Sequence, residues 1–231
     1  MKNKNSINHL SIILDGNKRW GKNHKLSVKD AYSAGINNVL AISEELIKKK
    51  IKYFSVFALS TENLKRKSVN IIFNSIFDRF SSFLDNVVTN KSIKIIVIGE
   101  RENIPIKLKE LIVEAEKKTF NNKKLTLILA FNYGFKNELI SVFKKGYNEI
   151  FSQKKKNLKN LQLDKLFYLG KIPDPDIMIR TGGYKRLSNF IMYNLCYTEL
   201  FFLETLWPDF DKNNLEQVIN EYSKIKRNYG L

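Results

Sequence analysis

The sequence predicts a single α/β domain over residues 1–231, with a mostly parallel central sheet of about six strands and helices on both faces. Three observations support this. Short apolar runs alternate with segments of helical periodicity. The runs are apolar throughout, which is typical of strands buried on both faces. Several runs end abruptly in polar residues, where a parallel sheet presents its ligand site.

Composition is consistent with one domain. The chain has 231 residues, 43% of them hydrophobic, and its four prolines and ten glycines form no linker-like stretch. The lone Cys196 excludes an intramolecular disulfide and a cysteine-based zinc site, which fits a reducing compartment. No segment reaches 18 consecutive apolar residues, and no small-residue cleavage site follows the basic start. We therefore expect a cytoplasmic protein.

The formal net charge of +17 invites a nucleic-acid interpretation. However, only seven of the 40 basic residues are arginine, and the lysines are scattered in runs typical of solvated helix faces. Arginine is therefore the more informative cation. Four arginines lie beside turns or glycines, where bidentate phosphate recognition would be useful: Arg19, Arg66, Arg180 and Arg186.

The first predicted strand, residues 10–14, passes directly into the polar sequence Asp15-Gly16-Asn17-Lys18-Arg19. Gly16 would let the backbone approach a ligand closely, and Arg19 offers a fork for phosphate. Asp15, at the carboxyl end of the strand, could hold a hard cation such as Mg²⁺. An ordinary surface turn explains the same residues and remains the alternative.

A helix over residues 31–50 leads to a second strand over 53–59. This strand also ends in polar residues, Ser60, Thr61, Glu62 and Asn63, with Arg66 shortly after. An N-cap box would account for the two hydroxyls without a ligand. The next helix, 69–88, carries a phenylalanine stripe that either packs in the core or lines an apolar channel for a greasy substrate.

The remaining elements continue the alternation. Strands are predicted over 93–98, 125–131, 175–180 and 198–202. Pro105 opens a helix, another follows Gly134, a Lys-rich loop covers 152–160, a short helix covers 161–170, and a last helix runs through 215–225. The fifth strand ends in Arg180-Thr181-Gly182-Gly183, and Glu199 places a carboxylate in an otherwise apolar run.

Taken together, the motifs resemble those of the cis-prenyltransferases, most closely the bacterial undecaprenyl diphosphate synthases. They are HLSIILDGNKRW, FALSTENLKR, FNYG, PDIMIRTGGYKRLSNF, and YTELFF followed by LWPDF, in that order. Each motif alone is weak, but the combination is specific and covers residues 9–228. The resemblance implies a Rossmann-like fold.

The resemblance also implies an activity: repeated joining of isopentenyl diphosphate to an allylic diphosphate such as farnesyl diphosphate, with Mg²⁺, in a homodimer. The product would be a long polyprenyl diphosphate, most plausibly undecaprenyl diphosphate, the precursor of a lipid carrier for cell-wall synthesis. It implies no nucleic-acid partner and at most peripheral contact with a membrane.

Site roles carry over residue by residue from the same resemblance. Asp15 and Asn63 would be catalytic; since an amide is a poor base, we expect Asn63 to position the nucleophile or relay a proton. Asp15 and Glu199 would be the metal-side carboxylates, with Glu199 supplied by the same chain or by the other subunit of the dimer. Substrate would be bound by Gly16, Asn17, Lys18, Arg19, Trp20, Ser60, Thr61, Glu62, Arg66, Arg180, Arg186, Leu187 and Ser188.

Six positions depart from the family pattern, among them Phe135 and Lys136, which follow Asn-Tyr-Gly where Gly and Arg are usual. Val28 and Tyr32 stand where an Arg and a His are usual, and Leu64 replaces a Trp. Tyr184 replaces the acid usual after the Arg-Thr-Gly-Gly motif. These departures leave a second hypothesis open, a non-catalytic partner subunit of a heteromeric enzyme. A basic nucleic-acid binder is a third, although the sequence has no base-reading motif.

Overall fold

The computed structural model describes residues 6–65, 91–102, 104–152 and 162–226. Six strands form one sheet in the order β3-β4-β2-β1-β5-β6, and every neighbouring pair is parallel. The strands are β1 (His9–Ile13), β2 (Tyr53–Ser60), β3 (Ile93–Ile98), β4 (Leu125–Tyr133), β5 (Ile177–Arg180) and β6 (Glu199–Phe202). The predicted sheet is confirmed.

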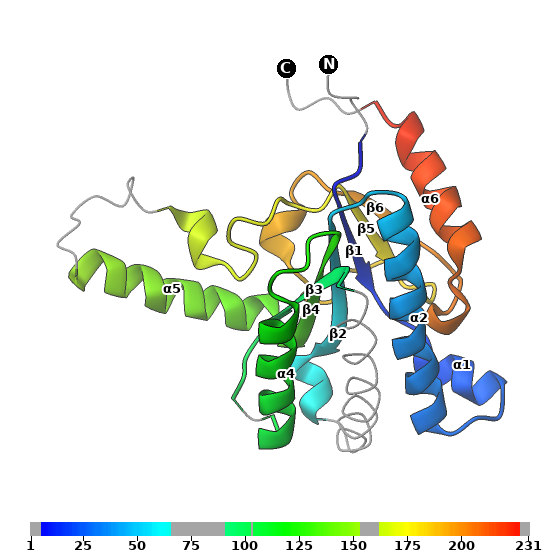
Figure 1. Cartoon of the computed structure of the whole chain (residues 1–231), viewed down its shortest axis with the longest axis horizontal. Helices are drawn as coiled ribbons and strands as arrows, with labels where there is room; N and C mark the ends of the chain where they lie inside the picture. The colour runs from blue at the N-terminus through cyan, green and yellow to red at the C-terminus, as the bar shows by residue number, and fades with distance from the viewer. Residues whose placement is uncertain (1–5, 66–90, 103, 153–161, 227–231) are drawn as a thin grey trace.

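The helices follow the strands in alternation (Figure 1). The α-helices are α1 (Asn17–Asn23), α2 (Val28–Lys48), α4 (Ile106–Thr119), α5 (Phe135–Ser152) and α6 (Lys212–Lys224). Short 3₁₀ turns are η1 (Thr61–Lys65), η3 (Leu163–Leu166), η4 (Met192–Leu195) and η5 (Trp207–Asp209). The predicted helix 161–170 is thus a single turn, while the phenylalanine helix and most of the Lys-rich loop fall outside the described residues.

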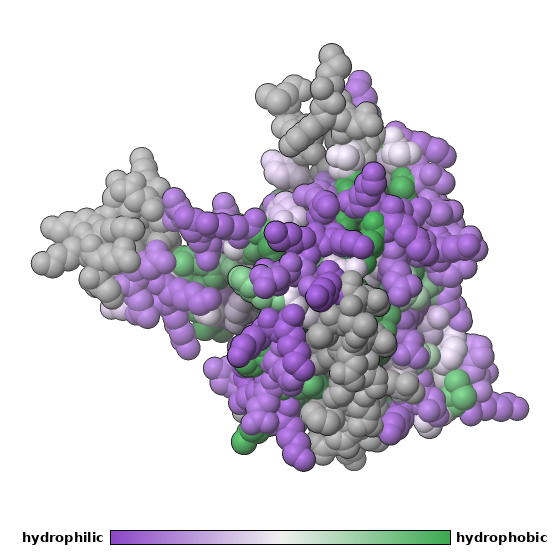
Figure 2. Space-filling model, viewed as in Figure 1, coloured by the Kyte–Doolittle hydropathy of each residue, from purple (hydrophilic) through white to green (hydrophobic). Residues whose placement is uncertain are grey.

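Each face of the sheet has its own apolar core. Alternate strand residues such as Leu10, Ile12 and Phe54 pack with α2, α4 and α6 on one face. The residues between them, such as Ile13 and Phe57, pack with Phe190 and its neighbours on the other face. The outward surfaces of α4 and α6 are mostly hydrophilic, as solvated lysine faces would be (Figure 2).

A buried polar cluster closes the amino edge of the sheet at His9. The His9 ring is 0% exposed; its Nδ1 lies 2.6 Å from the Pro173 carbonyl, and its Nε2 lies 2.8 Å from Ser55 Oγ. A carbonyl can only accept, so Nδ1–H donates to Pro173 and Nε2 accepts from the Ser55 hydroxyl. Burial lowers the pKa of His9 to about 4, so the ring is neutral at pH 7.

The helices were also compared with the requirements of a membrane-spanning segment. Within the described ranges, no helix combines the length and the apolarity that crossing a membrane requires.

Candidate functional site

A cavity of about 820 Å³ opens at the carboxyl edge of the sheet. Its mouth is lined by polar residues that follow β1, β2 and β5, as the sequence predicted from the polar ends of these runs. Its interior is apolar, with Leu127, Leu129 and Phe131 from β4, Val39 from α2 and Ile112 from α4. The site therefore combines a charged rim with an apolar interior.

The turn after β1 is shaped by Gly16. Its φ of 117° is in the left-handed region, and a Cβ there would lie 3.0 Å from the Leu206 Cα. Gly16 lines the cavity as predicted, but the structure adds a second reason for glycine, the close approach of Leu206. The side-chain hydroxyl of Thr181 accepts from the Asp15 backbone N–H at 3.1 Å, which ties this turn to β5.

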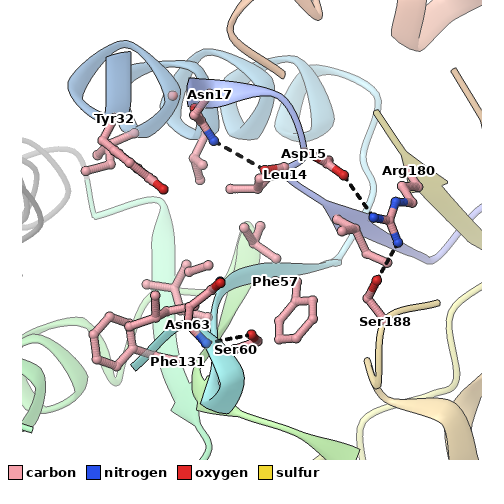
Figure 3. A pocket seen from close by; sticks show the side chains of 18 of the residues that line it. Leu14, Asp15, Asn17, Tyr32, Phe57, Ser60, Asn63, Phe131, Arg180 and Ser188 are labelled. Atoms are coloured by element: carbon pink, nitrogen blue, oxygen red, sulfur yellow. Dashed lines mark hydrogen bonds and ion pairs between the residues drawn. The ribbon is translucent and has the colours of Figure 1, made fainter. Parts of the chain in front are cut away.

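Asp15 is paired with two arginines, and Figure 3 shows its pair with Arg180. Its Oδ2 is 2.8 Å from Arg180 Nη2, and its Oδ1 is 3.2 Å from Arg19 Nη2. The Asp15 side chain is 26% exposed, whereas that of Arg180 is 4% exposed. Two guanidinium groups thus share one carboxylate, and the rim keeps an excess of positive charge.

Arg180 is held from several directions. Its Nη1 donates to Ser188 Oγ at 2.6 Å and to the backbone carbonyl of Arg186. Its buried Nε has no hydrogen-bond partner among the described residues. Arg180 is thus a buried cation whose carboxylate partner, Asp15, is partly exposed and is shared with Arg19. Its positive charge is only partly neutralised, which suits it to an anionic ligand.

The turn after β2 forms the facing wall. Asn63 lines the cavity, and its backbone N–H donates to Ser60 Oγ at 3.3 Å (Figure 3). Ser60 therefore serves as the predicted helix cap and also lines the cavity. Both interpretations of the β2 turn hold for Ser60.

Glu62 adds a second carboxylate to this wall. Asn189 Nδ2 donates to Glu62 Oε1 at 3.1 Å. Partial burial raises the pKa of Glu62, but hydrogen bonds from its own backbone N–H and from neighbouring side chains outweigh burial, so the pKa is lowered. Glu62 is therefore ionised at neutral pH.

Eleven of the residues proposed from the sequence line the cavity together. They are Asp15, Gly16, Asn17, Lys18, Arg19, Ser60, Glu62, Asn63, Arg180, Arg186 and Ser188. Arg66 and the phenylalanine stripe lie outside the described residues. Four lining residues with polar side chains were not proposed as site residues, namely Tyr32, Lys136, Tyr184 and Asn189. All four stand within or beside the quoted motifs or at a departure, which is the signal that could have identified them.

Trp20, Thr61 and Leu187 are not among the described residues that line the cavity, contrary to the prediction. The Trp20 indole N–H donates to Asp209 Oδ1 at 2.6 Å, and its ring packs against His24. Leu187 packs with the second apolar core instead. Helix α1 directs successive side chains to different sides, so the neighbours of a site residue need not face the site.

Glu199 is also separated from this cavity within one chain. It is the first residue of β6 and is in register with Ile177 at the start of β5, whereas Asp15 follows the end of β1. In parallel strands these positions are opposite edges of the sheet. A metal site formed by Asp15 and Glu199 of the same chain is therefore wrong.

The donor set at the rim fits a magnesium ion that is shared with a ligand. In the described part of the chain, no group of three or more His, Cys, Asp or Glu side chains could enclose a metal. Mg²⁺ is usually held by one or two carboxylates together with substrate phosphates and water. The partly exposed Asp15 carboxylate supplies such a ligand.

Comparisons with known proteins agree on one relationship. The chain matches the family model described as "Putative undecaprenyl diphosphate synthase" over residues 13–230. It is 35% identical over 229 residues to the isoprenyl transferase of Fusobacterium nucleatum, covering 98% of this chain and 97% of the relative. It is also 35% identical to the isoprenyl transferase of Thermotoga maritima, covering 96% of each chain.

Two solved structures share the fold. Lavandulyl diphosphate synthase from Lavandula x intermedia, in complex with dimethylallyl diphosphate, gives a TM-score of 0.91 at 28% identity, over 98% of this chain and 99% of that one. A "probable undecaprenyl diphosphate synthase" from Campylobacter jejuni gives a TM-score of 0.81 at 29% identity, over 98% of this chain and 100% of that one.

Proposed function

This chain belongs to the undecaprenyl diphosphate synthase family of prenyltransferases, and from that premise we propose that it condenses isopentenyl diphosphate repeatedly onto farnesyl diphosphate. A transferase of prenyl groups binds isoprenyl diphosphates, which have a charged head and an apolar tail. The observation that carries the proposal is a rim with excess cations above an apolar cavity of about 820 Å³. The diphosphate head matches the cationic rim, and the isoprenoid tail matches the apolar interior.

We assign the allylic diphosphate to the turn after β1. Asp15 Oδ1 lies 3.2 Å from Arg19 Nη2 there, and Asn17 and Lys18 belong to the same turn. As the allylic C–O bond breaks, negative charge develops on the departing diphosphate, and fixed cations around it lower the barrier. Mg²⁺, which Asp15 would hold together with diphosphate oxygens, would add further charge neutralisation.

We assign isopentenyl diphosphate to the groups after β5. Arg180, Arg186 and Ser188 are linked by the hydrogen bonds of Arg180, which sets their spacing. The terminal double bond of isopentenyl diphosphate attacks the allylic carbon as the allylic diphosphate leaves. The resulting cation then loses a proton to the released diphosphate or to water, which forms the new double bond. Asn63, on the facing wall, positions the nucleophile, because a carboxamide is too weak a base to take the proton itself.

The growing tail would extend into the apolar interior between β4, α2 and α4. We propose a long-chain product, undecaprenyl diphosphate; the apolar interior and the description of the matched family model support this proposal. The test is incubation of the purified chain with farnesyl diphosphate, radiolabelled isopentenyl diphosphate and Mg²⁺, followed by chromatography against polyprenol standards.

A labelled product of about eleven isoprene units is the expected result. No product from the isolated chain would contradict the proposal and favour a partner subunit of a heteromeric enzyme. Full activity in Asp15→Ala would contradict the assigned mechanism. A shorter labelled product would contradict only the length.

We further propose a homodimer formed through α5. Ile140, Phe143 and Tyr147 lie three and four residues apart on this helix, and each is more than half exposed. Helix α5 extends away from the sheet (Figure 1). An apolar stripe on such a helix is a suitable surface for a second copy.

Sedimentation of Phe143→Glu tests this surface. The variant is expected to be monomeric at concentrations where the parent chain is a dimer, because a buried unpaired carboxylate is costly. Phe120→Glu, at an equally exposed aromatic residue that follows α4, is the matched control and should stay dimeric. A parent chain that sediments as a monomer, or a dimeric Phe143→Glu, would contradict the proposed interface.

A further inference from the structure

The aromatic ring of Tyr184 is surrounded by the arginines of the site. The guanidinium carbon of Arg186 lies 4.3 Å from the ring centroid, that of Arg19 lies 5.1 Å away, and that of Arg180 lies 5.8 Å away. All three distances are within the range of a cation–π interaction. Tyr184 lines the cavity and is 45% exposed.

The backbone before Tyr184 directs the ring to this position. Gly182 and Gly183 have φ values of 82° and 81°, and their N–H groups donate to Thr205 and Leu203 at 2.8 Å each. These bonds fix the turn that carries Tyr184 back towards the rim. The contact of the Tyr184 ring with the arginines is therefore a consequence of the hydrogen-bonded turn that follows β5.

Three guanidinium groups that lie this close repel one another, and Asp15 is paired with only two of them. An aromatic face attracts cations through its quadrupole but carries no net charge. A carboxylate at residue 184 would instead neutralise part of the charge that a diphosphate needs. A tyrosine gathers the cations and leaves their charge available to the ligand.

We propose that Tyr184 is a positioning residue for the diphosphate site, which holds Arg19, Arg180 and Arg186 at fixed spacing through its ring face. Because Arg19 belongs to the proposed allylic subsite and Arg186 to the isopentenyl subsite, the ring couples the two. The proposal rests on the proposed function for the identity of the ligands, but not for the binding of diphosphate itself.

Calorimetry with inorganic diphosphate tests the role of the ring directly. Tyr184→Phe keeps the ring and should bind within about twofold of the parent chain. Tyr184→Leu keeps apolar bulk but loses the quadrupole, and its Kd should rise by about three- to tenfold. Tyr197→Leu, at an exposed tyrosine that does not line the cavity, is the matched control and should not change the Kd.

Kinetics separate positioning from general structural support. In Tyr184→Leu, the KM values for both diphosphate substrates should rise while kcat stays within about threefold, and Tyr184→Phe should restore the parent KM values. Unchanged diphosphate binding in Tyr184→Leu, equal losses in the Phe and Leu variants, or no diphosphate binding by the parent chain would overturn the inference. Ring-dependent diphosphate binding without any polyprenyl product would overturn only the proposed function.

Discussion

The two edges of the central sheet treat buried polar groups in opposite ways. At the amino edge, the His9 ring is fully buried and both of its nitrogens are paired. At the carboxyl edge, Arg180 is almost as buried, yet its Nε has no partner among the described residues and its anion is shared with Arg19. Strand β1 runs from one edge to the other, beginning at His9 and ending at Ile13, two residues before Asp15.

This difference separates residues that stabilise the fold from residues kept for a ligand. Paired buried groups contribute to stability, whereas an unpaired buried donor costs free energy until a ligand arrives. Beside the cavity, the backbone of Ser188 and Asn189 is also left-handed, with φ values of 50° and 66°. Strain of this kind is typical of functional sites.

The largest expected effect is at the carboxyl edge. Asp15→Asn should lower kcat about 1000-fold, because it removes the carboxylate that organises the departing diphosphate and would hold Mg²⁺. Initial rates with radiolabelled isopentenyl diphosphate measure the effect. Glu114→Gln is the control and should keep the parental rate, because it breaks the exposed Lys118–Glu114 ion pair (2.6 Å) on α4 and neither residue lines the cavity. An Asp15→Asn enzyme that retains a tenth of the parental rate or more would contradict this role of the Asp15 carboxylate.

The next effect belongs to the amino edge and should appear in stability. His9→Ala should lower the free energy of unfolding by about 3 kcal/mol, because it leaves a void and removes the partners of Ser55 and Pro173. Urea denaturation measures the change. Ser11→Ala, also buried in β1, removes one hydroxyl bonded at 3.2 Å and should cost less than about 1 kcal/mol. A loss of kcat in the folded His9→Ala protein would show that the amino edge is not purely structural.

A third effect is the dependence of stability on pH. The folded pKa of His9 is about 4 and the unfolded pKa is 6.5, so between these values the unfolded chain binds more protons. Stability from this residue is complete above pH 6.5 and falls as pH decreases towards 4, by about 2 kcal/mol at pH 5. Denaturation across this range should show a flatter profile for His9→Gln than for the parent chain. Identical pH profiles of stability for the two proteins would mean that His9 is not buried in its neutral form.

The smallest effect concerns the turn that carries the arginines. A Cβ on Gly182 would lie 2.5 Å from Arg19 Nη2 and 3.1 Å from the Asp15 carbonyl carbon. Gly182→Ala should therefore displace Arg19 and weaken binding of inorganic diphosphate about tenfold. Gly170→Ala introduces the same left-handed strain where the nearest atom is 3.7 Å away and should leave binding unchanged. Equal binding losses in both variants would attribute the effect to strain alone.

Much of the sheet and of the rim could be predicted from the sequence, because both depend on local patterns. Buried parallel strands are apolar throughout, and the polar residues that follow them must lie at one edge, which brought Asp15, Asn63 and Arg180 together.

Side-chain direction was harder to predict. Trp20 turns away on α1, and Glu199 lies at the opposite edge because β6 begins there. The role of Tyr184 depends on its distances to three arginines, one in α1, one at the end of β5 and one in the loop after β5, which only the fold brings together.

Simultaneous binding of two diphosphates along one rim can be measured directly by calorimetry. The chain is first saturated with farnesyl thiodiphosphate, a slowly reacting analogue, and isopentenyl diphosphate is then titrated in the presence of Mg²⁺. One equivalent of isopentenyl diphosphate per chain should bind without releasing the analogue, and the binding should be lost in Arg186→Ala. Competitive displacement of the analogue, or binding that does not require Arg186, would contradict a rim that holds both groups.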